Sequence, residues 1–207
     1  MIVIVDYGMG NLKSVENSAR LLGFDTKISS SPQAVKRAKK IIFPGVGHFA
    51  RAVKELKKRK LYPVLKEKIQ QGTPFLGICL GMQVLFEESQ EAPGFRGLGL
   101  IKGTVKRFNS QKLIIPHMGW NQIRVKGLGV GDKGNRLFQG IDDGSFFYFV
   151  HSYYCAPKEK DVILTTTDYG LEFASSIHKD NIWAVQFHAE KSQNLGLKLF
   201  NNFLKNC

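Results

Sequence analysis

Cys79 is the residue whose position most directly indicates chemistry. It lies between Gly77 and Gly81 in the segment GICLGMQ, with apolar residues on both sides. This G-x-nucleophile-x-G pattern is typical of a tight turn from a strand into a helix, where small residues let the two elements approach and the nucleophile points outward. A helix that begins here would favour the thiolate. A buried, unreactive thiol is the competing interpretation, and this motif alone leaves both open.

A cysteine nucleophile requires a general base and a group that orients the base. The segment WAVQFHAE supplies both, because His188 and Glu190 lie two positions apart at the end of an apolar strand. In an extended chain such side chains project to the same side. Glu190 then reaches one imidazole nitrogen while the other faces the sulfur. Taken alone, the His-x-Glu pattern is more often a strand-end histidine beside a surface glutamate.

The segment PGVGH (44–48) could supply the donors that an acyl-transfer site needs for its oxyanion. We expect its proline to end the preceding apolar strand and its glycines to let the backbone present N–H groups. In a parallel sheet this loop and the cysteine turn share the carboxyl edge, where open α/β sheets bind ligands. We therefore expect backbone groups of Gly45, Val46 and Leu80 to hold the oxyanion, although a plain turn is the alternative.

The elements around these segments predict an α/β fold with a central, mostly parallel sheet flanked by helices. In the first half, short apolar strands alternate with amphipathic helices, which is typical of a parallel sheet covered on both faces. The second half is mostly strands and predicts an antiparallel extension of that sheet or a second sheet. The expected strands are 2–8, 40–43, 73–78, 99–106, 120–125, 145–150, 162–167, 172–178 and 182–187. The expected helices are 12–22, 48–58, 61–71, 80–88 and 192–205, and a loop is expected at 126–134.

The composition indicates one globular domain spanning residues 1–207. The chain has 207 residues, of which 43% are hydrophobic and 23% are charged, and this is enough for one substantial core. No apolar run approaches the roughly 18 residues that span a bilayer, and Met1 leads directly into a short strand without a signal peptide. The three cysteines show no paired spacing, which favours the reducing cytoplasm.

The net charge of +13 admits two interpretations, a nucleic-acid binder or a solvated basic surface. Lysine and arginine cluster in KRAKK (36–40) and KELKKRK (54–60). In the second cluster the apolar residues recur at helical spacing, so the basic side chains fall on the wet faces of an amphipathic helix. No nucleic-acid motif accompanies them. We therefore expect no nucleic-acid partner.

Six segments carry a resemblance to a known family: DYGMGNLKSV (6–15), PGVGHF (44–49), GICLGMQ (77–83), IPHMGWN (115–121), YFVHSYY (148–154) and QFHAEKS (186–192). Together they resemble the class I glutamine amidotransferases along essentially the whole chain. Within that family the set is similar to the glutaminase subunits of imidazole glycerol phosphate synthases. IPHMGWN discriminates best, because glutaminases for anthranilate, aminodeoxychorismate or pyridoxal phosphate synthesis share the catalytic residues but not this segment.

The resemblance implies that Cys79, His188 and Glu190 hydrolyse glutamine through a thioester. It also implies that Gln83 and the backbone around His151, Ser152 and Tyr153 hold the α-groups of L-glutamine, the substrate. The ammonia would pass to a separate TIM-barrel cyclase subunit in a heterodimer. That subunit makes imidazole glycerol phosphate and aminoimidazole carboxamide ribotide in histidine biosynthesis.

Four residues on the resembling segments are candidates for the interface with the cyclase: Asn11, Trp120, Tyr148 and Lys191. Trp120 and Tyr148 have an alternative role as core aromatics. The family further implies that the isolated subunit is nearly inactive. The glycine-rich PGVG loop is the expected switch, because glycines let a peptide turn its N–H toward or away from the oxyanion.

No cofactor or metal is expected. DYGMGN follows a strand and opens a helix as a dinucleotide loop does, but Lys13 occupies the position of the third glycine. The histidines and cysteines lack the spacing of metal ligands. A non-enzymatic binding module that kept the fold is a further alternative, and the intact set of Cys79, His188 and Glu190 argues against it.

Overall fold

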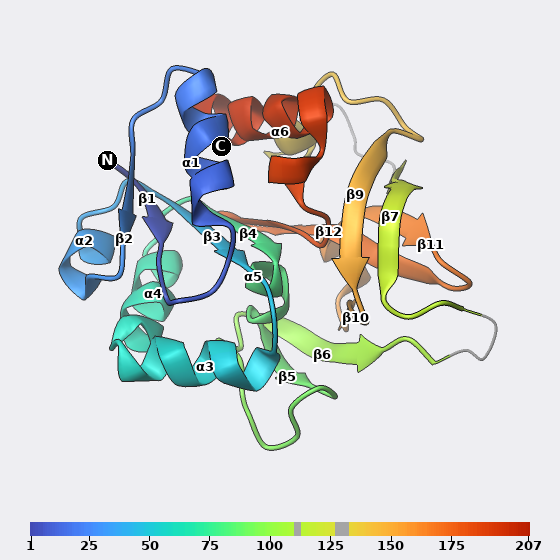
Figure 1. Ribbon diagram of the computed structural model, residues 1–207, viewed down its shortest axis with the longest axis horizontal. Helices are drawn as coiled ribbons and strands as arrows, with labels where there is room; N and C mark the ends of the chain where they lie inside the picture. Colours follow the sequence, from blue (N-terminus) through green and yellow to red (C-terminus); the bar gives the residue numbers. More distant parts are fainter. Residues whose placement is uncertain (110–112, 127–132) are drawn as a thin grey trace.

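A mixed β-sheet with helices on both faces forms the framework of the protein (Figure 1). The computed structural model describes residues 1–109, 113–126 and 133–207. The strands are β1 (Ile2–Val5), β2 (Thr26–Ser29), β3 (Lys40–Gly45), β4 (Phe75–Cys79), β5 (Phe86–Ser89), β6 (Ile101–Arg107), β7 (His117–Gln122), β8 (Arg124–Val125), β9 (Phe146–His151), β10 (Tyr153–Pro157), β11 (Ile163–Asp168), β12 (Glu172–Lys179) and β13 (Ile182–Val185). The α-helices are α1 (Leu12–Leu21), α2 (Pro32–Lys36), α3 (Phe49–Lys58), α4 (Leu61–Gln70), α5 (Leu80–Gln83) and α6 (Gln193–Asn206). The 3-10 helices are η1 (Lys133–Phe138), η2 (Lys160–Val162) and η3 (Ala189–Lys191).

The parallel half of the sheet runs in the order β2, β1, β3, β4, β13. Its central strands are apolar on both faces, and every residue of β4 is buried, as expected for parallel strands with helices on both sides. The carboxyl ends of β3, β4 and β13 therefore meet at one edge. The segments PGVG, GICLG and QFHAE all leave the sheet at this edge.

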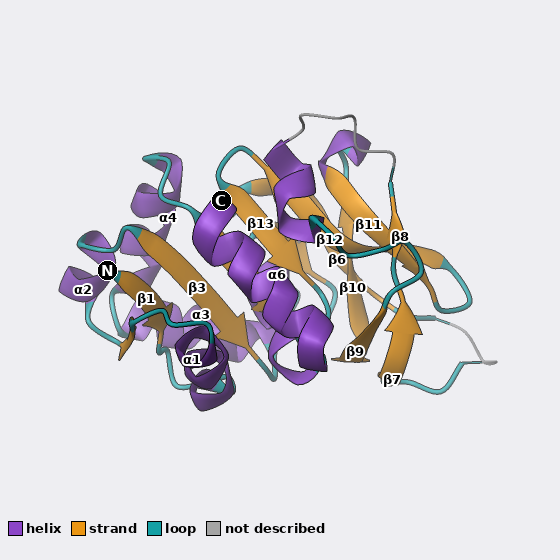
Figure 2. Cartoon of the chain, turned by 90° about the horizontal axis from the view of Figure 1, so that it is seen from above, coloured by secondary structure: helices purple, strands orange, loops and turns teal. Residues whose placement is uncertain are grey.

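Helices α1 and α6 cover one face of the sheet, while α2, α3 and α4 cover the other (Figures 1 and 2). Each face has its own apolar cluster, one built with α3 and α4 and the other with α1, α6 and β9. On α3 the buried positions Phe49, Ala52, Val53 and Leu56 share one side, so the periodicity of the sequence sets which face is packed.

The second half of the chain forms both an antiparallel extension of the sheet and a second sheet, the two arrangements that the sequence left open. β12 pairs antiparallel with β13 and continues the sheet through β10 to β6, while β11 and β8 branch from β12. β7 and β9 form a separate antiparallel pair. The predicted α/β fold with an antiparallel extension is confirmed, and a small second sheet is added to it.

Several predicted boundaries differ from those of the structure, and two of the differences bear on the site. The helix expected at 80–88 is the single turn α5, because the backbone of residues 84–87 instead bonds to residues 97–101 and enters β5. Pro44 does not end β3, which continues to Gly45. β1 pairs with β3 only as far as Ile42, so the missing N–H of a proline beyond that point costs no ladder bond.

Besides β5, the elements that were not predicted are β2, α2, β10 and the 3-10 helices η1, η2 and η3. The loop expected at 126–134 falls mostly outside the described residues. No helix in the described part of the chain has the length and apolar character needed to cross a bilayer.

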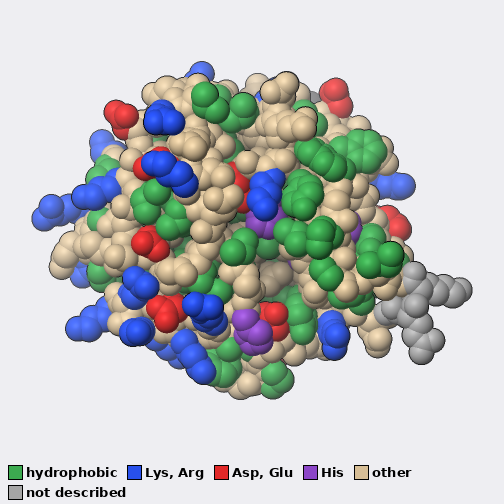
Figure 3. Space-filling view, viewed as in Figure 1, with side chains coloured by type: hydrophobic (Ala, Val, Ile, Leu, Met, Phe, Trp, Pro, Cys, Tyr) green, Lys and Arg blue, Asp and Glu red, His purple; other side chains and the backbone are tan. Residues whose placement is uncertain are grey.

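Part of the positive charge is used in contacts within the protein. Lys54 lies over the ring of Phe95 at 5.1 Å, and Lys57 lies over the ring of Tyr62 at 5.5 Å. Other basic side chains gather over α3 at the lower left of Figure 3. This fits the expected amphipathic helix with a basic, solvated side.

Replacing Lys40 by methionine should destabilise the junction between β3 and α6. The Lys40 Nζ atom donates to the carbonyl oxygens of Phe203 and Leu204 at 2.9 and 2.7 Å. Losing these charge-assisted bonds at a helix C-terminus should lower the free energy of unfolding by about 1–2 kcal/mol in urea titrations. Lys39→Met, at an exposed neighbour, is the matched control. Equal midpoints for the two variants would contradict the assignment.

Candidate active site

Cys79 is held in a backbone conformation that a non-glycine residue seldom adopts. It is the last residue of β4, its φ is 55° and its ψ is −109°, and α5 begins at the next residue. Such a conformation costs on the order of 1–3 kcal/mol and persists only where the surroundings impose it. The predicted strand-to-helix turn is therefore present. Because α5 has only four residues, the sulfur is served by one N-terminal turn and not by a long helix dipole.

The glycines on either side of Cys79 permit the close packing that imposes this turn. A Cβ atom on Gly81 would lie 1.9 Å from the carbonyl oxygen of Phe43, and one on Gly77 would lie 2.8 Å from that of Gly81. Both distances are shorter than any side chain tolerates. The G-x-C-x-G spacing is thus required by backbone contacts between β3, β4 and α5.

The end of β3 lies directly beside the sulfur-bearing residue. Gly45 pairs with Cys79 in the parallel register of β3 and β4, and Val46 and Gly47 follow it in the pocket wall. Gly47 has a φ of 100°. The predicted oxyanion loop is therefore adjacent to Cys79, with Leu80 on the other side of the turn.

His188 and Glu190 form a close, buried polar pair in the site. His188 Nδ1 lies 2.7 Å from Glu190 Oε1, and their side chains are 1% and 2% exposed. The Nε2 atom has no hydrogen-bond partner among the described residues. Burial alone disfavours the imidazolium, but Cys79 and Glu190 outweigh it and raise the pKa of His188 to about 10. The arrangement therefore favours the imidazolium form of His188.

The geometric reason given for the His188–Glu190 pair was wrong. β13 ends at Val185, and Glu190 lies in η3, so a 3-10 turn brings the carboxylate back to the imidazole. The same spacing also occurs at His178 and Asp180, where the ring nitrogen lies 2.9 Å from the Asp180 carbonyl oxygen. Spacing alone could not separate the two pairs.

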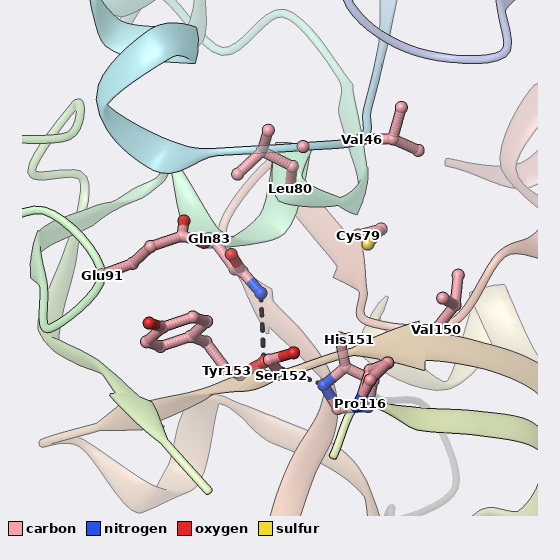
Figure 4. Close-up of a pocket in the computed structure, with 11 residues that line it drawn as sticks. Val46, Cys79, Leu80, Gln83, Glu91, Pro116, Val150, His151, Ser152 and Tyr153 are labelled. Atoms are coloured by element: carbon pink, nitrogen blue, oxygen red, sulfur yellow. Dashed lines mark hydrogen bonds between the residues drawn. The ribbon is translucent and has the colours of Figure 1, made fainter.

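A cavity of about 340 Å³ opens beside Cys79 (Figure 4). Cys79 is only 6% exposed, and it lines this cavity. The same cavity is the hollow near the centre of the face shown in Figure 3. Its lining includes the predicted residues Val46, Leu80, Gln83, His151, Ser152 and Tyr153.

Two polar residues of the site were missed by the sequence analysis. Glu91 lines the cavity, and its Oε2 atom accepts a 2.7 Å bond from the Phe49 backbone. Gln186 is fully buried, and its Nε2 atom lies 3.6 Å from the Cys79 sulfur. Gln186 stands within the segment QFHAEKS but received no role. No sequence signal marked Glu91.

Three of the four interface candidates lie together. Trp120 is 46% exposed and packs edge-on against Tyr148 at 6.1 Å, while Lys191 Nζ lies 5.6 Å from the Tyr148 ring centre. Trp120 is therefore not a core aromatic, and Tyr148 is half-buried. Asn11 is exposed at the N-terminus of α1, where its side chain makes no cap bond.

The family model described as glutamine amidotransferase class-I matches residues 3–207. The chain belongs to this class I glutamine amidotransferase family. A relative from Moorella thermoacetica, named imidazole glycerol phosphate synthase subunit HisH, is 46% identical over 202 residues, covering 98% of this chain and 93% of the relative. One of the same name from Pyrococcus furiosus is 48% identical over 203 residues, covering 98% and 97%.

Solved structures of class I glutamine amidotransferases share the fold. A crystal structure named glutamine amidotransferase has a TM-score of 0.75 at 19% identity and covers 99% of this chain and 98% of that chain. PurLQS from Thermotoga maritima has a TM-score of 0.74 at 17% identity, with coverage of 98% and 96%. Within the described residues of this family member, no group of three or more His, Cys, Asp or Glu side chains could hold a metal ion.

Gly81→Ala should disrupt the turn that carries Cys79. The new Cβ would lie 1.9 Å from the Phe43 carbonyl oxygen, so β3 and α5 must separate. We expect the free energy of unfolding to fall by about 3 kcal/mol or more, at or above the upper end for overpacked cores. Gly72→Ala is the control, since its φ is 88° but no described atom lies within 4 Å of the new Cβ. Equal losses in urea titrations would show that packing does not impose the turn.

Proposed function

We propose that this chain is the glutaminase subunit of an imidazole glycerol phosphate synthase. The observation that carries the proposal is the strained Cys79 lying between Gly45 on β3 and the buried His188–Glu190 pair. The names of full-length relatives at 46% and 48% identity support the choice of synthase over another glutamine-dependent enzyme. The match over residues 3–207 supports a single glutamine amidotransferase domain.

In the first half of the reaction, the Cys79 thiolate attacks the side-chain amide carbon of glutamine. The backbone N–H groups of Leu80 and Val46 hold the oxyanion. Gly45 and Gly47 flank Val46 and give the backbone the freedom to turn its N–H group toward the oxyanion. The His188 imidazolium gives its proton to the leaving nitrogen. The carbon–nitrogen bond breaks, ammonia leaves and a thioester to Cys79 remains.

In the second half, neutral His188 takes a proton from water, and the hydroxide attacks the thioester carbon. The carbon–sulfur bond breaks, which releases glutamate and restores the Cys79 thiolate beside the His188 imidazolium. Glu190, 2.7 Å from Nδ1, orients the ring through both halves. The net reaction is glutamine plus water to glutamate, ammonia and the proton that the new carboxyl group loses.

Glutamine fits the cavity with its amide at Cys79 and its α-groups at the far wall. Glu91 supplies a carboxylate for the α-ammonium group. Gln83 and the backbone of His151, Ser152 and Tyr153 line the rest of that wall (Figure 4). A cavity of about 340 Å³ suits one small amino acid.

The ammonia is used by a TIM-barrel cyclase subunit that binds as the second chain of a heterodimer. The cyclase converts it into imidazole glycerol phosphate and aminoimidazole carboxamide ribotide, and we place this histidine-biosynthetic step in the cytoplasm. The β7–β9 pair is the proposed docking face, because Met118, Trp120 and Phe146 are 62%, 46% and 49% exposed there. Lys191 and Tyr148 extend this face, and Asn11, exposed at the N-terminus of α1, is a further proposed contact.

Cys79→Ala should abolish glutamine hydrolysis and leave the fold intact. The chain is assayed for glutamate release with a cyclase subunit and its ligand present, and circular dichroism reports the fold. Cys207→Ala, at the chain end far from the site in sequence, is the control and should retain full turnover. Turnover at the wild-type level in Cys79→Ala would refute the assigned nucleophile.

Gly47→Ala should change activation by the partner more than glutamine binding. The φ of Gly47 is 100°, and the added Cβ would lie 3.0 Å from Met9 Cε, so the loop loses conformational freedom. We expect the ratio of turnover with and without the loaded cyclase to fall severalfold while KM for glutamine changes less. Gly23→Ala, with a φ of 80° and no described atom within 4 Å, should leave the ratio unchanged. An unaltered ratio in Gly47→Ala argues against the loop as the switch.

A further inference from the structure

A buried amide side chain contacts the Cys79 sulfur. Gln186 directly follows β13 and is fully buried. Its Nε2 atom donates toward Cys79 Sγ at 3.6 Å, and its Oε1 atom lies 3.2 Å from Gln83 Nε2. An amide can be turned end for end, which would aim its oxygen at the sulfur. The neighbouring groups therefore decide whether Gln186 helps or opposes a thiolate.

Gln83 fixes the orientation of Gln186. Its Nε2 atom lies 3.1 Å from the Tyr153 carbonyl oxygen, which can only accept a hydrogen bond (Figure 4). The nitrogen of Gln83 must therefore face Tyr153, and its second hydrogen is directed to Gln186 Oε1. With the oxygen of Gln186 used in this way, its nitrogen faces the sulfur.

The Tyr153 carbonyl oxygen also fixes the hydrogens of two imidazoles. His151 Nδ1 lies 2.8 Å from this oxygen, so Nδ1 carries the hydrogen (Figure 4). His151 Nε2 in a neutral ring then accepts, and its partner at 2.9 Å is His117 Nδ1, which donates. Both rings are held in one tautomer by their partners.

The outer end of this series lies on β7. His117 Nε2 is 3.1 Å from Asn121 Nδ2, which donates to it and also donates to the Asp168 carbonyl oxygen at 2.9 Å. Asn121 Oδ1 accepts from the Gln122 backbone at 2.8 Å, so the asparagine cannot be reversed. We call the connected residues Asn121, His117, His151, Tyr153, Gln83 and Gln186 the amide–imidazole chain.

Both imidazoles of the chain are neutral at pH 7. Burial lowers the pKa of His117 to about 4 and that of His151 to about 3. The His117 ring is stacked between Tyr169 and Phe149, with centroid distances of 4.0 and 4.9 Å. Neutral rings in fixed planes let Asn121, His117 and His151 each donate toward the Tyr153 carbonyl oxygen, which Gln83 also bonds from the other side.

We propose that Gln186 donates a hydrogen bond that favours the Cys79 thiolate, and that His117 is a positioning residue that, through His151, holds in place the Tyr153 carbonyl oxygen to which Gln83 and hence this donor are bonded. The inference rests on the proposed function only in taking Cys79 as the nucleophile. The titratable groups that influence the sulfur are His188, Tyr7 and Cys155. Burial raises the pKa of Tyr7 and of Cys155, so both are neutral at pH 7 and His188 is the charged partner.

The rate at which iodoacetamide alkylates Cys79 tests the donor without requiring glutamine turnover. The rate is measured at pH 7 on the free chain, and mass spectrometry of the Cys79 peptide separates it from the other cysteines. Gln186→Met keeps the length of the side chain but removes the donor. It should slow alkylation roughly tenfold, because a hydrogen bond to a charged atom is worth about that factor or more. A wild-type rate would overturn the proposal, whatever the glutaminase assay gives.

His117 variants test the positioning role. His117→Phe keeps a stacked ring but loses both hydrogen bonds, and should slow alkylation severalfold. His117→Asn, which keeps a donor near the Nδ1 position, should restore most of the rate. His178→Phe is the matched control, because His178 packs against Trp183 at 4.9 Å and is not part of the amide–imidazole chain. Cys79 in this variant should be alkylated at the wild-type rate. A wild-type rate in His117→Phe would overturn the positioning role.

A double variant separates positioning from general loosening of the structure. If His117 acts only through Gln186, then His117→Phe combined with Gln186→Met should be no slower than Gln186→Met alone. Multiplied losses would mean that His117 acts elsewhere, and would overturn its role in the chain. Circular dichroism checks each fold. If His117→Phe does not fold, Asn121→Ala replaces it in the same double-mutant comparison, because Asn121 is the outer end of the amide–imidazole chain.

Discussion

The parallel pairing of β3 with β4 is the constraint on which the site depends. It sets Gly45 opposite Cys79 and brings the Phe43 carbonyl oxygen against Gly81. The strained φ of Cys79 persists because the chain cannot relax without separating two buried strands. β13 pairs with the other side of β4, so the segment that carries Gln186 and His188 leaves the sheet beside the same cysteine. Three neighbouring strand ends thus carry the proposed nucleophile, oxyanion donors and base.

The polar groups around the sulfur come in two kinds. His188 and Glu190 carry charge in a buried pair whose Nε2 and Oε2 atoms have no described partner, as suits groups that exchange a proton during a reaction. The amides and imidazoles on the other side are neutral and bonded to one another. Burial lowers the pKa of His188 and of His117 alike. At His188 the neighbouring Cys79 and Glu190 outweigh burial, whereas at His117 burial prevails.

The sequence was sufficient for the residues that short-range rules govern. The G-x-C-x-G spacing, the strand–helix alternation and the helices at 12–22, 48–58 and 61–71 follow from local sterics and periodicity. Contacts between distant segments were not visible. Residues 84–87 form β5 because residues 97–101 bond to them, and Gln186 touches Cys79 from more than a hundred positions away. Glu190 reaches His188 through a 3-10 turn that the sequence pattern did not predict.

The exposed apolar side chains of β7 and β9 make the large net charge relevant to self-association. One side of the molecule has an apolar surface that includes Met118, Trp120 and Phe146. Hydrophobic side chains gather at the right of Figure 3. Two copies that met through such surfaces would bury them against each other. A net charge of +13 on each copy makes that encounter repulsive. The basic surface then opposes association between free copies. Dissolved salt would weaken this repulsion by screening charges that lie farther apart than the Debye length.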